Sequence, residues 1–148
     1  MKPNCATHGE RHKGILIGMR KVAFLTAVLA SLWNLTIIVA VTFDEHWVTT
    51  RAAGGQFEHF PLAIRVIYGV EALLIIAQIY FTYLLTVRSG AWNIWSWQFS
   101  RILIGIYLLS AFFNGLSRSA DEKLNSPVAL LLVWSLIYLA GRERPIAR

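Results

Sequence analysis

The residues of this chain that could do chemistry are a few polar side chains inside long apolar stretches, and Glu71 is the foremost of them. An ionisable group at membrane depth is costly and is tolerated mainly where it has a partner or a purpose. We expect the Glu71 carboxyl to be neutral, because an apolar surrounding disfavours its charged form unless a cation is near. A neutral carboxyl can donate a hydrogen bond or exchange a proton with a cavity.

Each of the four apolar stretches contributes one polar side chain at a similar depth. Counted from the outer end of each stretch, these side chains lie roughly 10 to 14 Å down at 1.5 Å per helical residue. They are Asn34, Glu71, Ser110 and Ser135. If the four stretches form one bundle, these side chains meet in a single polar layer.

Further polar and aromatic residues border this layer. Gln78 lies on the Glu71 face of the same helix, and Asn114 lies one turn from Ser110. The polar seam therefore extends from the outer surface toward the inner leaflet. The aromatic residues expected beside a pocket at this level are Trp33, Trp134 and Tyr107, together with Tyr68 one turn from Glu71.

Arg65 is the cation nearest to Glu71 in the sequence. Six residues on one helix are a rotation of about 240°, so Arg65 and Glu71 point to different faces and direct pairing is not expected. Tyr68, three residues from each, could bridge them.

The polar layer allows three interpretations. Its side chains could hydrogen-bond across helices and only fix the packing of the bundle. They could form a pathway for a proton- or cation-coupled carrier through an oligomer, with Glu71 as the titrating group. They could also line a pocket for a lipid-like or quinone-like ligand.

Metal sites and enzymatic motifs are weakly represented. His46, Glu58 and His59 flank two predicted helix ends and could hold a divalent ion, but a solvated acidic loop is the favoured explanation. Cys5, His8 and His12 lack a fourth zinc ligand. The chain has no Gly-rich phosphate loop, HExxH, GxSxG or CxxC motif, so we expect no catalytic residue, metal or cofactor.

An aromatic cluster precedes the third apolar stretch. It consists of Trp92, Trp95 and Trp97, followed by Arg101. Such residues anchor a chain in the headgroup layer of a membrane, although a stacking platform for a flat ligand has the same composition.

The elements that must position these residues are the four apolar stretches, at about residues 22–43, 62–87, 97–117 and 127–140. The chain of 148 residues is 56% hydrophobic and 15% charged, with a mean hydropathy of +0.53. About 20 apolar residues in a helix cross a bilayer core about 30 Å thick. We therefore predict an all-α membrane protein, an antiparallel four-helix transmembrane bundle over residues 22–141. Within the first helix, Ala23, Ala27 and Ser31 form a small-residue stripe for close helix packing.

The basic residues predict the orientation of this bundle. Of the fourteen Lys and Arg, only Arg51, Arg65, Arg118 and Lys123 fall outside if both termini are cytoplasmic. The positive-inside rule favours that arrangement, with residues 1–21 and 142–148 as basic cytoplasmic tails. The first stretch continues without a break, which favours an uncleaved anchor over a signal peptide. We expect a bacterial-type plasma membrane, and no nucleic-acid partner despite the net charge of +6.

No motif names a substrate or a reaction, so the expected function rests on architecture. Minimal loops and scarce reactive groups favour a non-enzymatic accessory or scaffold subunit that packs against a larger membrane complex or against copies of itself. The expected partners are membrane lipids and that complex. A small oligomeric transporter or channel using Glu71 and a binder of a lipid-like or quinone-like ligand are the alternatives.

Overall fold

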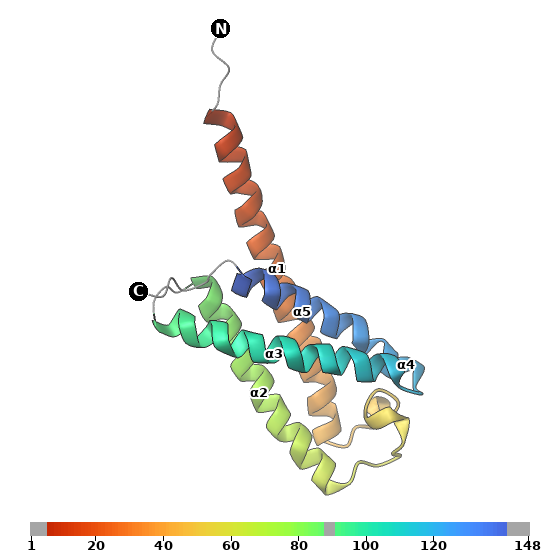
Figure 1. The fold of residues 1–148 in the computed structure, drawn as a ribbon. Helices are drawn as coiled ribbons and strands as arrows, with labels where there is room; N and C mark the ends of the chain where they lie inside the picture. The colour runs from red at the N-terminus through yellow and green to blue at the C-terminus, as the bar shows by residue number, and fades with distance from the viewer. Residues whose placement is uncertain (1–5, 88–90, 142–148) are drawn as a thin grey trace.

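The computed structural model describes residues 6–87 and 91–141, and every regular element in these ranges is helical (Figure 1). The main helices are α1 (Ala6–Thr42), α2 (Leu62–Val87), α3 (Ala91–Leu116) and α5 (Asn125–Gly141). Shorter elements are η1 (His46–Val48), η2 (Ala53–Gly55) and α4 (Ala120–Lys123).

Four segments of this structure are long and apolar enough to cross a membrane. They are Gly18–Thr42, Leu62–Val87, Trp95–Leu116 and Ala120–Ala140. Only helices that satisfy their own backbone hydrogen bonds are stable in lipid, and these segments meet that condition. The predicted all-α class, with four helices long and apolar enough to cross a membrane, is confirmed.

Two helices begin earlier than the sequence predicted. Helix α1 starts at Ala6 instead of Val22, and α3 starts at Ala91 instead of Trp97. The glycines at 9, 14 and 18 suggested a tail, but extending an existing helix requires no new nucleation and tolerates residues of low helix propensity. The remaining ends of the main helices agree with the prediction within two residues.

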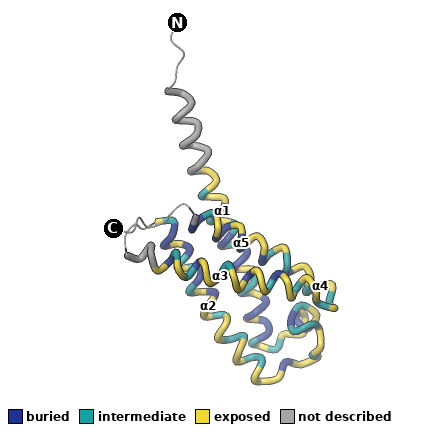
Figure 2. Tube along the Cα trace, in the orientation of Figure 1, coloured by how far each residue is buried: buried dark blue, intermediate teal, exposed yellow. Residues whose placement is uncertain are grey.

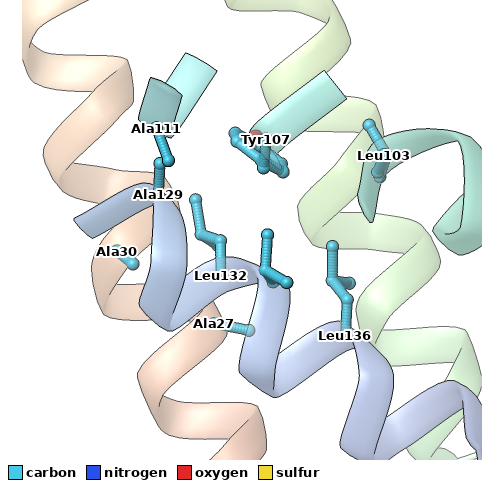
Figure 3. Packing of buried hydrophobic residues seen from close by; sticks show 9 residues of the cluster. Ala27, Ala30, Leu103, Tyr107, Ala111, Ala129, Leu132 and Leu136 are labelled. Carbon is cyan, nitrogen blue, oxygen red and sulfur yellow. The ribbon is translucent and has the colours of Figure 1, made fainter. Parts of the chain in front are cut away.

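The main core lies where α5 packs between α1 and α3 (Figure 3). Small residues of α1 and α3 face the larger side chains Leu132 and Leu136 of α5, both of which are fully buried. The buried cluster comprises Ala27, Ala30, Leu103, Tyr107, Ala111, Ala129, Leu132, Val133 and Leu136. The stripe of Ala23, Ala27 and Ser31 is buried inside this bundle.

Two connections of the chain meet at one end of the bundle, which we call the loop end (residues 43–61 and 117–124). Thr50 Oγ1 donates to Asp121 Oδ2 at 2.8 Å, and Asn125 Nδ2 donates to the Arg51 carbonyl at 3.2 Å. Ser119 donates to the Thr50 carbonyl. These bonds hold the loop after α1 against the α3–α5 connection.

Helix α1 ends in a Schellman motif at the loop end. The Glu45 N–H donates to the Ala40 carbonyl at 2.9 Å, and the Asp44 N–H donates to the Val41 carbonyl at 3.1 Å. Asp44 takes the left-handed conformation of this motif, with φ of 60°. Its carboxylate accepts from the Phe60 N–H at 2.7 Å and contacts His59 Nδ1 at 3.2 Å. The Phe60 hydrogen bond, assisted by His59, holds the pKa of Asp44 below its ordinary value.

Helix α2 contacts its neighbours unevenly along its length. At the end near Val87, Phe81 packs on Phe99 of α3 with ring centroids 4.7 Å apart. The buried residues of α2 are Ile75, Gln78, Thr82, Leu84 and Leu85, so the half nearer the loop end has none. Figure 1 shows α2 and α3 diverging toward the loop end, and Figure 2 shows α2 largely exposed there.

Candidate functional site

A polar cavity of about 120 Å³ lies where α2 and α3 diverge. Helix α1 contributes Asn34 and two isoleucines, the loop end contributes three further residues, and α5 contributes Asn125. The lining residues are Asn34, Ile37, Ile38, Arg51, Ala52, Tyr68, Glu71, Ile75, Tyr107, Ser110, Asn114, Glu122 and Asn125. A cavity of this size could hold a few water molecules or a small polar group, at about 30 Å³ per water.

Glu71 and Asn34 are the two lining residues whose side chains make no hydrogen bond or ion pair within the described ranges. Glu71 is exposed and Asn34 is half-buried, so both can be reached from the open side of the cavity. A carboxyl and an amide within membrane-spanning helices are costly when they lack partners. The cavity therefore presents unused polar groups between helices that are long and apolar enough to cross a membrane.

Most other polar groups around the cavity are already engaged. The Tyr68 hydroxyl interacts with the backbone of Ala53. Asn114 Nδ2 donates to Ser110 Oγ at 3.2 Å, which joins the two polar residues of α3. The wall is thus held in place by its own hydrogen bonds, and the groups left for a ligand are those of Glu71 and Asn34.

Gln78 lies next to this cavity in a closed hydrogen-bond network. Its Nε2 donates to Ser31 Oγ at 2.8 Å, and its Oε1 accepts from the Tyr107 hydroxyl. Gln78 and Ser31 are each 1% exposed, so three helices are joined by polar contacts in the interior. The network shares Tyr107 with the lining of the cavity.

The loop end supplies charged residues that the sequence prediction of the site missed. Arg51 lies 3.9 Å from Asp121 in an ion pair and 6.0 Å from the centroid of the Trp33 ring. Glu122 accepts a hydrogen bond from Ser117. The local sequence of these loops does not indicate that they fold over the polar layer. Their charges beside a helix end were a weak signal for charged residues near the site.

Several predicted site residues lie elsewhere. Ser135 is fully buried in the bundle but does not line the cavity, and its Oγ has no partner in the described ranges. Trp33 is outside the lining, with Nε1 donating to Asn125 Oδ1 at 3.4 Å. Trp134 is exposed and stacks on Tyr138, with ring centroids 6.1 Å apart.

Arg65 binds the backbone instead of a carboxyl. Its Nε donates to the Thr42 carbonyl at 2.8 Å, near the end of α1. The guanidinium therefore stabilises the C-terminal end of a helix, where positive charge is favourable. Arg65 does not line the cavity, and no ion pair joins it to Glu71 among the described residues.

The predicted anchor lies at the opposite end of the bundle. Arg101 stacks on Trp97 at 4.8 Å from the ring centroid, and Trp95 is exposed. Trp92 falls within α3, but its side chain lies outside the described part of the structure. These contacts fit a headgroup anchor, which stays a prediction.

The weak metal candidates do not form a cluster. Where side chains are described, no three His, Cys, Asp or Glu residues are close enough to share a metal ion. Among the three candidates, His59 contacts Asp44, while His46 and Glu58 are exposed. The predicted group of Cys5, His8 and His12 falls outside the residues whose side chains are described.

Comparison of the chain with protein-family models, with curated proteins and with solved structures gives no match. The fold defines a class, an all-helical chain in the described ranges with four helices long and apolar enough to cross a membrane, and any function must be argued from the polar cavity between them.

Proposed function

We propose that this chain is a non-enzymatic membrane protein that binds a lipid-like ligand, with the polar head of the ligand in the cavity around Glu71. The observation that carries the proposal is the pair of unengaged polar side chains, Glu71 and Asn34, in one open cavity. Polar residues that only fix helix packing are expected to find partners, as Gln78 does.

The surroundings of the cavity suit an amphipathic molecule. Ile37, Ile38 and Ile75 supply apolar surface beside the polar groups. The exposed residues of α2 and α3 that flank the cavity are also apolar, among them Val70, Leu74 and Phe113. A ligand could therefore place its head beside Glu71 and leave its tail in lipid, without a closed pocket around the whole molecule.

The proposal includes an antiparallel bundle with both termini in the cytoplasm. Arg65 of α2 meets the last turn of α1 through Thr42, while Arg20 of α1 donates to Leu85 near the end of α2 at 2.7 Å. Each helix thus meets the far end of its neighbour. With the positive-inside rule, the loop end and the cavity then face the non-cytoplasmic leaflet.

The accessory-subunit function stays a second expectation. An unpaired carboxyl could also receive a basic side chain from a partner helix, since oppositely charged groups pair inside membranes. The small-residue stripe of α1 no longer favours such a partner, because the bundle buries it. The ligand is therefore the better supported occupant.

The test is purification of the tagged protein from its native membrane in a mild detergent, followed by native mass spectrometry and extraction of bound small molecules. Ser110→Phe should fill the cavity, whereas Leu109→Phe adds the same ring to a side chain that is 61% exposed. We expect a lipid-like molecule with the parent and with Leu109→Phe, and its loss with Ser110→Phe.

Two results would contradict the proposal. Retention of the same molecule by Ser110→Phe would place it outside the cavity. Reproducible co-purification of a larger complex, with no cavity-dependent small molecule, would favour the accessory subunit instead.

A further inference from the structure

We infer that the head of the bound ligand is an organic ammonium group, held by the Glu71 carboxylate and flanked by the rings of Tyr68 and Tyr107. This inference rests on the proposed function and specifies its ligand class. It depends on three features of the cavity: which charges are already paired, which hydroxyls are already used, and which ligand atoms can reach the remaining groups.

The charged residues around the cavity differ in what they have left to offer. Arg51 is paired with Asp121 and faces Trp33, so its charge is already shared. Glu122 accepts from Ser117. Glu71 is the lining carboxyl that has no hydrogen-bond or ion-pair partner in the described part of the chain. The Glu71 carboxylate is therefore the charged group that remains for a ligand, and it would attract a positive charge.

Tyr68 and Tyr107 would contact a ligand through their rings, because their hydroxyl groups already have partners in the protein. The Tyr107 hydroxyl donates to Gln78, and the Tyr68 hydroxyl interacts with the backbone of Ala53. Both residues nevertheless line the cavity. The negative face of an aromatic ring attracts an ammonium group, and the attraction is stronger where water is excluded.

Asn34 adds an acceptor that suits an ammonium N–H. Its side chain has no partner in the described ranges and lines the same cavity as Glu71. The amide oxygen could take one N–H of a primary ammonium while the carboxylate takes another. A charge-assisted hydrogen bond of this kind is stronger than one between neutral groups.

Other ligand heads fit less well. A hard metal cation needs several oxygen ligands, commonly from more than one carboxylate, and the described residues include no cluster of three metal-binding side chains. An anionic head would meet Glu71 and Glu122, with Arg51 already paired. A neutral carbonyl head, as in a quinone, would need a donor from a protonated Glu71 and is the main alternative outcome.

The experiment compares two probes of one chain length, dodecylamine and its neutral N-acetyl derivative. Binding to the purified full chain is measured in maltoside micelles, which carry neither ammonium nor anionic headgroups. We expect the parent to bind the amine at least tenfold more tightly than the amide. Glu71→Gln should abolish this preference, and Glu71→Asp, which keeps the charge, should retain most of it.

A matched control removes a carboxylate from outside the cavity. Glu45 is exposed and does not line the cavity, so Glu45→Gln should leave the preference for the amine unchanged. An equal loss in Glu45→Gln and Glu71→Gln would show nonspecific attraction and overturn the inference.

The two proposals fail in distinguishable ways. If both probes bind the parent equally and Ser110→Phe removes them both, the cavity is a ligand site but the ammonium inference is wrong. If Ser110→Phe changes the binding of neither probe, the inference and the proposed function both fail. If the amide binds more tightly and Glu71→Gln reverses this, the neutral carbonyl head replaces the ammonium.

Discussion

Gln78 and Glu71 lie two turns apart on one face of α2, yet their surroundings are opposite. Gln78 is buried and bonded to Ser31 and Tyr107 from two neighbouring helices. Glu71 is exposed on the open side of a cavity and lacks such partners in the described ranges. The same helix face therefore serves packing at one level and remains available for binding at another.

The separation between helices explains this difference. Near Gln78, α2 touches both α1 and α3, and the aromatic contact of Phe81 with Phe99 follows one turn further. Near Glu71, α3 has moved away, and the loop after α1 fills part of the space with Arg51 and Ala52. A polar side chain finds a helical partner only where the helices are close.

The largest effect should come from the packed region, at Leu132. This side chain is fully buried, whereas its neighbour Leu131 is 49% exposed. Leu132→Ala should lower the free energy of unfolding by about 2 to 4 kcal/mol, because it leaves a void in a close-packed core. Leu131→Ala should change it by less than about 1 kcal/mol, as expected for a surface substitution. Equal losses in reversible unfolding in micelles would show that the core is placed wrongly.

The direct comparison of Gln78 with Glu71 should give a smaller difference. Gln78→Leu strands the Tyr107 hydroxyl and should cost about 1 to 2 kcal/mol. Glu71→Leu should leave the free energy of unfolding unchanged or raise it, because it removes a costly polar group from an apolar helix. Loss of stability in Glu71→Leu would indicate a structural role and weaken the proposed binding site.

The coupling free energy between Tyr107 and Gln78 tests whether their hydrogen bond stabilises the packed region around Gln78. Tyr107→Phe removes only the hydroxyl that donates to Gln78. A double-mutant cycle with Gln78→Leu should give a coupling near 0.6 kcal/mol, typical of interhelical hydrogen bonds in membranes. A cycle of Tyr107→Phe with Glu71→Leu serves as the control and should give a coupling near zero. A larger coupling to Glu71 would mean that the two regions are one network.

The smallest effect should be confined to the loop end, at Asp44. Its pKa is lowered in the folded chain by the Phe60 N–H and by His59, so the charged form stabilises the fold. That contribution is present above the unfolded value of about 3.9 and is lost as pH falls through the lower folded value. Asp44→Asn keeps an acceptor for Phe60 but removes the charge.

Melting temperatures of Asp44→Asn and the parent should therefore differ at neutral pH and converge below about pH 4. Glu58→Gln, which changes an exposed carboxyl of the same loop, is the matched control and should show little difference at either pH. A difference between Asp44→Asn and the parent that persists undiminished in acid would exclude the charge as its cause.

The sequence by itself determined the class of this protein and the approximate bounds of its spans. Hydrophobic runs of about 20 residues specify membrane helices, because the length needed to cross a bilayer and the need to satisfy backbone hydrogen bonds are local requirements. The same runs identified Glu71 as a costly residue, since its cost depends on depth and not on its neighbours. The early starts of α1 and α3 were not predicted, because helix extension overrides weak breakers.

Which polar residues meet was decided by the tertiary structure. Depth counting grouped Ser135 with Asn34, Glu71 and Ser110, but Ser135 is fully buried in the bundle and does not line the cavity. Arg51, Glu122 and Asn125 joined the site only because the two loops fold together over it. Depth is set by position along one helix, whereas helix rotation, divergence and loop placement depend on contacts between distant segments, and no local pattern encodes them.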